Sequence, residues 1–550
     1  MCRKYINVKC SSEIAIRSLD EEISYAELRK EVCKRERYLS QNLNQNQNVI
    51  ALCMNRGIEY IYWIFAILQS GKTFLPIGYH EMHEKKEKIL KDANPDLILV
   101  DDIDYFSIKK DKILMVKNLR YSDEENSEYH FLKYNDKNRI AYIIYTSGTT
   151  GVPKGVKIPY KALWNFLDNF LPEKMIKGEI ILANTTFLFD IAMAEIILPI
   201  FRGGSLYITN EQEQKNVRVI LKLFEKYKFD WVQFTPTFVK MLIQDNLYCG
   251  NWKYIKNIII GGEMVSSSLV KLIKKYTKAK VYNAYGPTEA TIWSHFCRID
   301  NKNTIVIGKP IKNVEEFILD DYMNEVQKGK LWLAGRALST GYLNDEQLTK
   351  KKFLIYKGKK IYDTGDVACK TDFGIQILGR SDNQIKISGK RLELEELNIY
   401  VEKLYNGIVL NIGNKIYVLL KKENEDFITA KKRIKECFPT DVKISGIYEI
   451  PEFPVMDNGK MDLKMLKETI IQMQRTEEKL IKILNEYTDD AVSKKMRMFE
   501  VGLDSIEYVE ILVKCENAFG ITFEDSKLVM ESFETVEELL HYIEERMRKI

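Results

Sequence analysis

Short apolar runs alternate with amphipathic segments along most of the chain. Residues 24–43 have helical periodicity, with Ser24 in the N-cap position, and residues 48–54 form a continuous apolar run. Further runs of this kind lie at 96–102, 178–186 and 254–263. Short buried strands that alternate with helices are typical of an α/β architecture. The pattern therefore predicts an α/β fold with mostly parallel sheets.

The pattern changes near residue 380. Residues 379–397 are polar and alternate like a strand before they turn helical, which indicates a smaller α+β unit. From residue 474 the chain becomes almost entirely helical, with amphipathic segments at 475–487, 505–519 and 535–550. Three such helices joined by short loops are typical of a small helical bundle.

Composition narrows the class of protein. The 550 residues suit several domains, and the net charge of +5, from 83 basic and 78 acidic side chains, argues against a dedicated nucleic-acid binder. Nine cysteines without CxxC spacing predict a reducing compartment and no zinc site. The apolar run at 60–71 is too short to span a bilayer, and the first residues lack a signal-peptide pattern. We therefore expect a cytoplasmic protein with neither nucleic acid nor membrane as a partner.

One loop gives the first chemical signal. Residues 142–156, YIIYTSGTTGVPKGV, pass from an apolar run into a loop rich in glycine and hydroxyl groups, and Lys154 follows. Backbone N–H groups, hydroxyls and a lysine are donors that hold phosphate. The spacing differs from the P-loop of ATPases, in which Ser or Thr directly follows Gly-Lys. The loop therefore predicts a phosphate site without specifying the reaction.

Further motifs follow this loop in a fixed order. They are NAYGPTEATIW (283–293), YDTGD (362–366), GRSDNQIKISGKRLEL (379–394) and NGKMD (458–462). With them the chain resembles the amino-acid adenylation domains of nonribosomal peptide synthetases, in the adenylate-forming superfamily that also contains acyl-CoA synthetases. The tail, FEVGLDSIEYVEI (499–511), resembles a peptidyl carrier domain. The resemblance covers nearly the whole chain, and five motifs in one order are very specific.

The resemblance implies both architecture and reaction. It implies a large adenylation subdomain at 1–381, a small mobile subdomain at 382–469 and a carrier domain at 474–550. Such an enzyme uses ATP and Mg²⁺ to form an aminoacyl-AMP and pyrophosphate, and then loads the amino acid onto covalent 4′-phosphopantetheine. The implied partners are a phosphopantetheinyl transferase and a downstream condensing, modifying or releasing enzyme, in the biosynthesis of peptide antibiotics or related secondary metabolites.

The resemblance also assigns a nucleotide site. Tyr285 would lie against adenine, Thr288 would contact the α-phosphate, and Glu289 would hold Mg²⁺. Asp366 would accept hydrogen bonds from the ribose hydroxyls. Lys460 would neutralise the substrate carboxylate and the α-phosphate as they meet. The phosphate loop, the adenine edge and the rest of the nucleotide site would involve Thr146, Ser147, Gly148, Thr149, Thr150, Lys154, Gly262, Asn283, Gly286 and Arg380.

Two positions are implied for the second half-reaction. Asp382 matches the hinge about which the small subdomain turns, and Gly389 would then approach the pantetheine arm. Ser505 matches the phosphopantetheine attachment serine, at a helix start that suits an anionic phosphodiester. Taken alone, a serine before a helix is more often an N-cap.

Asp190 would pair with the substrate α-amino group, by the same resemblance. The other pocket positions are Ile191, Ala194, Gln233, Ile259, Gly261, Ala284, Ile292 and Trp293. None of them is charged, so amino acids with ionic side chains are poor candidates, because a buried charge needs a partner. The set resembles a glycine-type pocket, although Ala194 and Ala284 stand where bulky leucines are usual. We expect glycine as the substrate, with a larger neutral or aromatic amino acid as the alternative.

Two other functions are compatible with parts of the pattern. One is an acid–CoA ligase with a fused helical domain, which Asp190 and the Ser505 motif disfavour. The other is a degenerate adenylate-binding scaffold, which retention of the catalytic positions disfavours. Lys330 and Thr340 depart from the family pattern, outside both the proposed catalytic and adenine positions.

Overall fold

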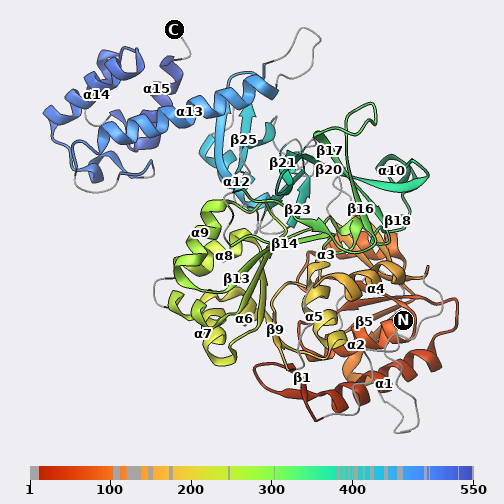
Figure 1. Cartoon of the computed structure of the whole chain (residues 1–550). Helices are drawn as coiled ribbons and strands as arrows, with labels where there is room; N and C mark the ends of the chain where they lie inside the picture. Colours follow the sequence, from red (N-terminus) through yellow and green to blue (C-terminus); the bar gives the residue numbers. More distant parts are fainter. Residues whose placement is uncertain are drawn as a thin grey trace. The chain divides into compact units, whose positions relative to one another are not determined.

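The computed structural model describes most of the chain, as two compact units, Met1–Leu397 and Asn398–Ile550 (Figure 1). The described residues are 12–102, 112–119, 138–146, 153–171, 178–245, 248–300, 302, 304–380, 384–387, 390–393, 397–398, 401, 407–412, 415–421, 427–438, 442, 444–454, 463–488, 492–494, 496–529 and 532–547.

The largest sheet of the first unit has a parallel centre and antiparallel edges. Its central strands β13, β12, β11, β9, β10 and β1 run parallel, whereas β14, β15 and β2 pair antiparallel at the edges. In spatial order the described strands are β15 (Lys309–Pro310), β14 (His295–Arg298), β13 (Lys280–Tyr285), β12 (Asn257–Gly261), β11 (Trp231–Phe234), β9 (Ile180–Ala183), β10 (Ser205–Ile208), β1 (Ile14–Arg17) and β2 (Glu22–Ser24).

A second sheet of the first unit repeats this design. Strands β7, β4, β3, β5 and β6 are parallel, and β8 and β18 are antiparallel at one edge. The predicted α/β class is therefore confirmed, with sheets that are mixed rather than purely parallel. In spatial order the described strands are β18 (Gly341–Tyr342), β8 (Lys154–Pro159), β7 (Ile140–Thr146), β4 (Thr73–Pro76), β3 (Val49–Cys53), β5 (Leu97–Val100) and β6 (Ile113–Met115).

Antiparallel strands complete the first unit. One sheet contains β16 (Val314–Leu319), β17 (Lys328–Gly335), β20 (Lys359–Thr371), β19 (Phe353–Tyr356) and β21 (Gly374–Arg380), and a separate hairpin contains β22 (Gln384–Ile387) and β23 (Lys390–Glu393). The long strand β20 pairs with β17, β19 and β21, so residues of the YDTGD motif are fixed between several neighbours.

The helices of the first unit follow the sequence signals closely. In α1, Ser24 accepts a hydrogen bond from Glu27 N–H while the Glu27 side chain returns to the Ser24 backbone, which is a complete capping box. In α2 nearly every side chain is buried, as its continuous apolar sequence predicts. The described helices are α1 (Tyr25–Asn42), α2 (Ile58–Gln69), α3 (His83–Ala93), α4 (Tyr160–Asn169), α5 (Ile191–Arg202), α6 (Glu211–Lys215), α7 (Val217–Tyr227), α8 (Pro236–Gln244), α9 (Ser267–Tyr276) and α10 (Glu346–Lys352).

The second unit combines a small sheet with helices. Strand β25 (Lys415–Lys421) pairs antiparallel with β24 (Gly407–Ile412) and parallel with β26 (Ile444–Ile450). Helix α12 (Phe427–Cys437) contacts β26. The described C-terminal helices are α13 (Leu463–Leu484), α14 (Ser505–Phe519) and α15 (Val536–Met547).

Helix α13 begins earlier than the predicted segment 475–487. Its first half packs Leu466, Ile470 and Met473 against the β24–β26 sheet, and its last turns pack Leu480 and Leu484 into the bundle core. Packing on the sheet stabilises residues that the bundle alone would leave exposed. The predicted interdomain segment at 470–473 lies inside this helix, and the three domain boundaries stay predictions.

The first residues of α14 show whether Ser505 is the N-cap of this helix. Asp504 is the N-cap and accepts hydrogen bonds from the N–H groups of Ile506 and Glu507, while Glu507 completes a capping box. Ser505 is the exposed first helical residue. The N-cap reading of Ser505 is therefore wrong, because Asp504 occupies that position.

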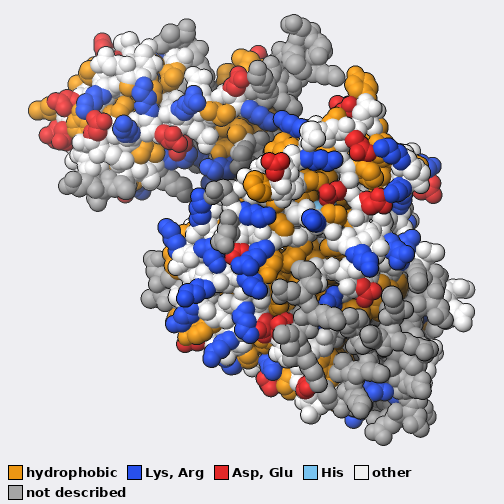
Figure 2. All heavy atoms as spheres, in the orientation of Figure 1, with side chains coloured by type: hydrophobic (Ala, Val, Ile, Leu, Met, Phe, Trp, Pro, Cys, Tyr) orange, Lys and Arg blue, Asp and Glu red, His pale blue; other side chains and the backbone are white. Residues whose placement is uncertain are grey.

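Lys and Arg side chains are scattered over the visible face, with Asp and Glu side chains among them (Figure 2). Within the part of the chain that the structure describes, no helix combines the length and apolar character needed to cross a bilayer.

Replacement of Asp504 by alanine should weaken α14 locally. Loss of the cap should lower the opening free energy of its first-turn amides by about 0.5–2 kcal/mol, the usual cost of a lost N-cap. Hydrogen exchange read by mass spectrometry on the full chain measures this effect. Ser505→Ala is the matched control and should shift the same amides by less than about 0.5 kcal/mol. Equal effects of the two variants would contradict the assignment of Asp504 as the cap.

Candidate active site

A strained turn lies between the antiparallel strands β13 and β14. Thr291 and Ile292 both have left-handed backbone conformations, with φ of 58° and 66°. This region is costly for β-branched residues, and such strain persists only where the surroundings enforce it. The surrounding residues therefore enforce the backbone conformation of residues 286–294.

Two hydrogen bonds and one close backbone approach define this turn. The Ile292 N–H donates to Asp190 Oδ2 at 3.2 Å, and Thr291 Oγ1 donates to the Ala337 carbonyl at 2.6 Å. At Gly286 a Cβ would come within 2.4 Å of the Ile292 carbonyl oxygen. The glycine of the NAYGPTE motif is thus required by close backbone approach, not only by turn geometry.

Strand register brings the predicted pocket positions together. Gln233 on β11 pairs with Ile259 on β12, and Gly261 on β12 pairs with Ala284 on β13. Because alternate residues of a strand point to one side, these four positions share one face of the sheet. They lie at the carboxyl ends of parallel strands, where open α/β sheets bind ligands.

The start of α5 supplies the remaining pocket positions. Asp190 is the residue before the helix, yet its carboxylate makes no helix-cap hydrogen bond and instead accepts from Ile292. Its side chain is 5% exposed. Ile191 and Ala194 follow on the first turn of α5, and Ala194 joins the hydrophobic cluster that contains Ile259 and Ala284. The structure therefore brings Asp190 into contact with Ile292, another of the predicted pocket positions.

Trp293 covers the β12 side of this pocket. A Cβ at Gly261 would meet the six-membered ring of the indole at 2.6 Å and the Ala284 carbonyl at 2.5 Å. The indole Nε1–H donates to Gln233 Oε1 at 2.8 Å. The indole thus lies directly over Gly261 and is anchored by a hydrogen bond to the neighbouring strand.

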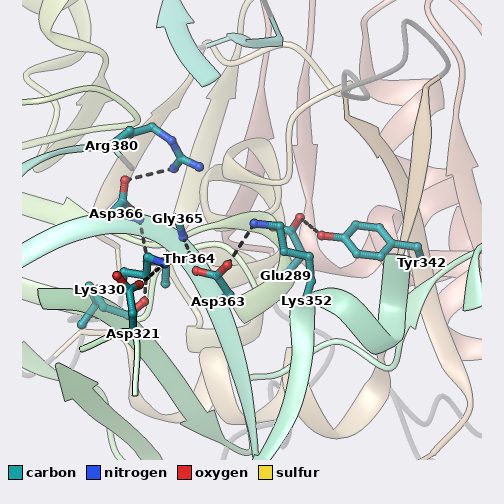
Figure 3. A network of polar contacts seen from close by, with 11 residues as sticks. Glu289, Asp321, Lys330, Tyr342, Lys352, Asp363, Thr364, Gly365, Asp366 and Arg380 are labelled. Carbon is teal, nitrogen blue, oxygen red and sulfur yellow. Dashed lines mark hydrogen bonds and ion pairs between the residues drawn. The ribbon is translucent and has the colours of Figure 1, made fainter. Parts of the chain in front are cut away.

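A polar cluster gathers three of the predicted nucleotide residues, of which Figure 3 shows Asp366 and Arg380. Tyr285 Oη donates to Asp366 Oδ2 at 2.5 Å, and Arg380 Nη1 donates to Asp366 Oδ1 at 3.0 Å. Asp366 and Arg380 face each other across the β20–β21 pair. Burial, followed by the Asp366 carboxylate, raises the pKa of Tyr285 well above its ordinary value. The phenol is therefore a neutral hydrogen-bond donor at neutral pH.

The turn before Asp366 is itself fixed. Asp363 accepts from the Gly365 N–H at 2.9 Å and forms an ion pair with Lys352 at 3.2 Å (Figure 3). Thr364 Oγ1 accepts from the Asp366 N–H. These contacts set the position of the Asp366 carboxylate.

Glu289 is fully buried on the short helix η5 (Thr288–Ala290). Its Oε1 accepts from Tyr342 Oη at 2.7 Å (Figure 3). Tyr342 lies on β18, beside Val156 on β8, and η5 also contacts β8. The predicted metal and α-phosphate residues are therefore joined to the strand that begins with Lys154.

The donor set fits a magnesium ion that is shared with phosphate. Among the described residues no group of three His, Cys, Asp or Glu side chains forms a metal cage. Magnesium keeps waters and binds through one or two carboxylates together with phosphate oxygens. A single carboxylate at Glu289, beside Thr288, suits that coordination.

The phosphate loop connects two antiparallel strands. Thr146, the last residue of β7, pairs with Lys154, the first residue of β8. The predicted residues Ser147, Gly148, Thr149 and Thr150 lie outside the described residues, as do Lys460, Asp382 and Gly389. The loop thus closes a hairpin, unlike the strand-to-helix turn of a P-loop.

The adenine-edge positions lie at the ends of β12 and β13. Gly262 directly follows β12 and has φ of 82°, a conformation that favours glycine. Asn283 is buried, and its Nδ2 donates to the Val306 carbonyl at 2.9 Å. The adenine contact of these two residues stays a prediction.

The two departures from the family pattern have local partners. Lys330 Nζ forms an ion pair with Asp321 at 2.7 Å, and Thr340 Oγ1 donates to the Lys157 carbonyl at 3.3 Å. Both residues stabilise turns and strand ends by these contacts.

Two residues of this region escaped the sequence-based prediction. Tyr342 holds Glu289, and Glu195 on α5 accepts from the Gln233 side chain at 3.0 Å. A single acid within the apolar stretch IAMAEIILPIF was the available signal for Glu195. Its partner Gln233 lies on β11, 38 residues away, and could not be inferred from local sequence.

Comparisons with known proteins agree with this geometry. The family model for AMP-binding enzymes matches residues 4–343, and the model for the phosphopantetheine attachment site matches residues 478–543. Bacitracin synthase 3 of Bacillus licheniformis is 28% identical over 93% of this chain, which spans only 8% of that relative's length.

Solved structures share the fold. One is holo-PA1221, a nonribosomal peptide synthetase protein with adenylation and carrier domains, with a TM-score of 0.70, 20% identity and coverage of 97% of this chain and 94% of that one. Another is the Vibrio cholerae adenylation domain AlmE in complex with glycyl-adenosine-5′-phosphate, with a TM-score of 0.68, 19% identity and coverage of 84% and 95%. The chain therefore belongs to the AMP-binding enzymes, as an adenylate-forming ligase of the nonribosomal peptide synthetase type with a phosphopantetheine carrier region.

Proposed function

We propose that this ligase activates glycine as glycyl-AMP and loads it onto phosphopantetheine at Ser505. One observation carries the proposal: the segment that joins β13 to β14 contributes to both halves of the site. Tyr285 and Glu289 belong to its nucleotide side, whereas Ile292 and Trp293 belong to the amino-acid pocket. A nucleotide and an amino acid bound to these residues would lie next to each other, because one short segment of the chain contacts both.

The nucleotide side has suitable groups for each part of ATP. Asp366 retains acceptor lone pairs for the ribose hydroxyls while Tyr285 and Arg380 hold it. When bound at Glu289, Mg²⁺ supplies positive charge to the phosphate oxygens. Lys154 and Lys460 add further positive charge where two anionic groups must react.

The amino-acid side provides a buried carboxylate at Asp190. Asp190 is almost fully buried, and a buried carboxylate is strongly stabilised by an opposite charge. The ammonium group of an α-amino acid supplies that charge when its carboxylate points toward the nucleotide. One Asp190 oxygen binds the Ile292 backbone, which orients the carboxylate before substrate arrives.

The pocket walls support glycine over larger substrates. Trp293 lies across Gly261, and Ala194 and Ala284 are packed within the main hydrophobic cluster with Ile259 and Ile292. The fold neighbour AlmE, in complex with glycyl-adenosine-5′-phosphate, is consistent with this choice. A larger neutral amino acid remains the alternative that the experiments below distinguish.

The carrier region supports protein partners. Ser505 is exposed, and Ile506, Val509 and Val513 of α14 expose 72%, 41% and 47% of their surface nearby. Exposed apolar side chains at helical spacing are suited to transient protein contacts. We infer that a phosphopantetheinyl transferase, and later a condensing, modifying or releasing enzyme, bind here in the cytoplasm during biosynthesis of a peptide or related secondary metabolite.

The replacement Asp190→Asn should remove amino-acid activation while it keeps the pocket folded. Asparagine retains an oxygen acceptor for the Ile292 N–H but lacks the charge that binds the substrate ammonium. ATP–pyrophosphate exchange with glycine should fall by about 10²-fold or more, the scale of a lost buried charge pair. Asp320→Asn, at an exposed turn, is the matched control. If Asp190→Asn kept the wild-type rate of ATP–pyrophosphate exchange, the proposal that this pocket binds an amino acid through Asp190 would be contradicted.

The replacement Tyr342→Phe should weaken the response to magnesium. Without the phenol, Glu289 loses the donor that orients its carboxylate. The Mg²⁺ concentration for half-maximal exchange should rise by about 10-fold, as is usual when a residue that orients a metal ligand is removed. The exposed Tyr322→Phe provides the control. An unchanged magnesium titration would exclude this role for Tyr342.

Paired variants test the two half-reactions. Ser505→Ala should retain exchange but form no covalent aminoacyl protein, because the thioester has no attachment point. Lys460→Ala should lower exchange by about 10²–10³-fold, yet load the carrier from preformed glycyl-AMP. All proteins are first treated with a phosphopantetheinyl transferase and CoA. Loss of exchange in Ser505→Ala, or thioester formation with free CoA alone, would favour an acid–CoA ligase.

A further inference from the structure

Glu195 is a buried acid in an otherwise apolar helix. It lies in the second turn of α5, five residues after Asp190, and its side chain is 1% exposed. A buried carboxylate is costly unless several donors surround it. Its neighbours therefore reveal why the chain keeps a charge at this position.

Four hydrogen-bond donors converge on Glu195. Its Oε2 accepts from the Asn184 N–H at 2.9 Å and the Thr185 N–H at 2.8 Å. Its Oε1 accepts from Thr185 Oγ1 at 2.5 Å and from Gln233 Nε2 at 3.0 Å. Burial raises the pKa of Glu195, and the bonds from Thr185 and Gln233 oppose that shift. The carboxylate thus ties the segment after β9 to the Gln233 amide.

Arg56 reinforces the same segment. Its guanidinium donates to the carbonyls of Ala183, Thr185 and Thr209, each within 2.7 Å. It also stands over the Phe187 ring, with 4.6 Å from Cζ to the ring centroid. Burial lowers the pKa of Arg56 to about 10, so the group remains charged at neutral pH and attracts Glu195. The donors to Glu195 are therefore themselves held in place.

The hydrogen-bonding groups on either side of Gln233 fix the orientation of its side-chain amide. A carboxylate has only acceptors and an indole Nε1–H is only a donor. Gln233 lies between them, so its NH₂ must face Glu195 and its oxygen must face Trp293. In the reverse orientation, the Gln233 NH₂ would face the donor N–H of Trp293, and the Gln233 oxygen would face the acceptor oxygen of Glu195. The Ile191 carbonyl accepts from the same Nε2 at 3.3 Å, so Glu195 shares the orientation of this amide with one backbone acceptor and is the side chain that holds it.

We propose that Glu195 is a positioning residue that sets the size limit of the amino-acid pocket. It holds the Gln233 amide in one orientation, and the amide holds the Trp293 indole across Gly261. The side chain admitted beside Asp190 is then restricted to hydrogen or one small group. This inference rests on the proposed glycine-activating function, and it deepens that function by naming the residues that enforce the choice.

The replacement Glu195→Gln should relax selectivity. Its oxygen must serve the two backbone N–H groups, so its NH₂ turns toward Gln233 and reverses that amide. The Trp293 hydrogen bond is then lost. The ratio of kcat/KM for glycine over alanine in exchange should fall by about 3- to 10-fold, the scale of one buried hydrogen bond. Gln233→Leu breaks the same link without touching the backbone bonds of Glu195, and should relax the ratio similarly.

An exchange of the two side chains separates positioning from general stability. In the double variant Glu195→Gln, Gln233→Glu, the carboxylate at position 233 can accept from both Trp293 and the amide at position 195. Selectivity should therefore return toward wild type. The matched control is Glu213→Gln, another buried acid, which binds Tyr207. It should leave the ratio unchanged.

A readout without substrate makes the inference independent of the assignment of glycine. The chain has 6 tryptophans, so 5-fluorotryptophan labelling gives few fluorine resonances, and Trp293→Phe identifies that of Trp293. This resonance should move or broaden in Glu195→Gln and in Gln233→Leu, return in the double variant, and stay unchanged in Glu213→Gln.

Two results would overturn the inference. One is a Trp293 resonance and a selectivity ratio that are both unchanged by Glu195→Gln and by Gln233→Leu. The other is a loss of selectivity in Glu195→Gln that the double variant does not recover. Glu195 would then stabilise only the backbone. Wild-type exchange with a larger amino acid and none with glycine would instead contradict the proposed substrate. In that case the same variants are compared on that amino acid and its next larger homologue.

Discussion

The hydrogen bond from the Ile292 N–H to Asp190 connects two parts of the chain that are 102 residues apart. It secures a turn in which Thr291 and Ile292 adopt a conformation that β-branched residues rarely accept. The segment that joins β13 to β14 carries residues of both the proposed nucleotide site and the proposed amino-acid pocket. Without that bond the turn could relax, and both halves of the site would lose their common support.

The polar groups around this turn form separate networks with different tasks. Tyr285 and Arg380 hold the Asp366 carboxylate, whereas Tyr342 holds Glu289. In each case a phenol orients an acid by a hydrogen bond, and Arg380 adds an ion pair at Asp366. Under the proposed function, the remaining acceptor positions of these acids would serve the ribose hydroxyls and a metal ion.

Much of the architecture was predictable because local signals and tertiary packing agree. Ser24 caps α1 as the sequence indicates, and the apolar runs become buried strands. The pocket positions followed from the family resemblance, and strand register explains why they meet. The role of Glu195 was not predictable, since its donors are brought to it by the fold from the segment after β9 and from β11. The early start of α13 was missed because Leu466 and Ile470 are stabilised by tertiary packing on the β24–β26 sheet, which the helical pattern alone does not reveal.

The proposed function has one chain select glycine and attach it to its own carrier serine. Intact mass spectrometry of the pantetheinylated wild-type chain, given Mg²⁺, ATP and an equimolar mixture of the proteinogenic amino acids, tests this proposal. We expect a single glycyl group on the carrier region at Ser505. A different aminoacyl group at Ser505 would contradict the pocket argument, and the absence of any covalent aminoacyl product would contradict the carrier function.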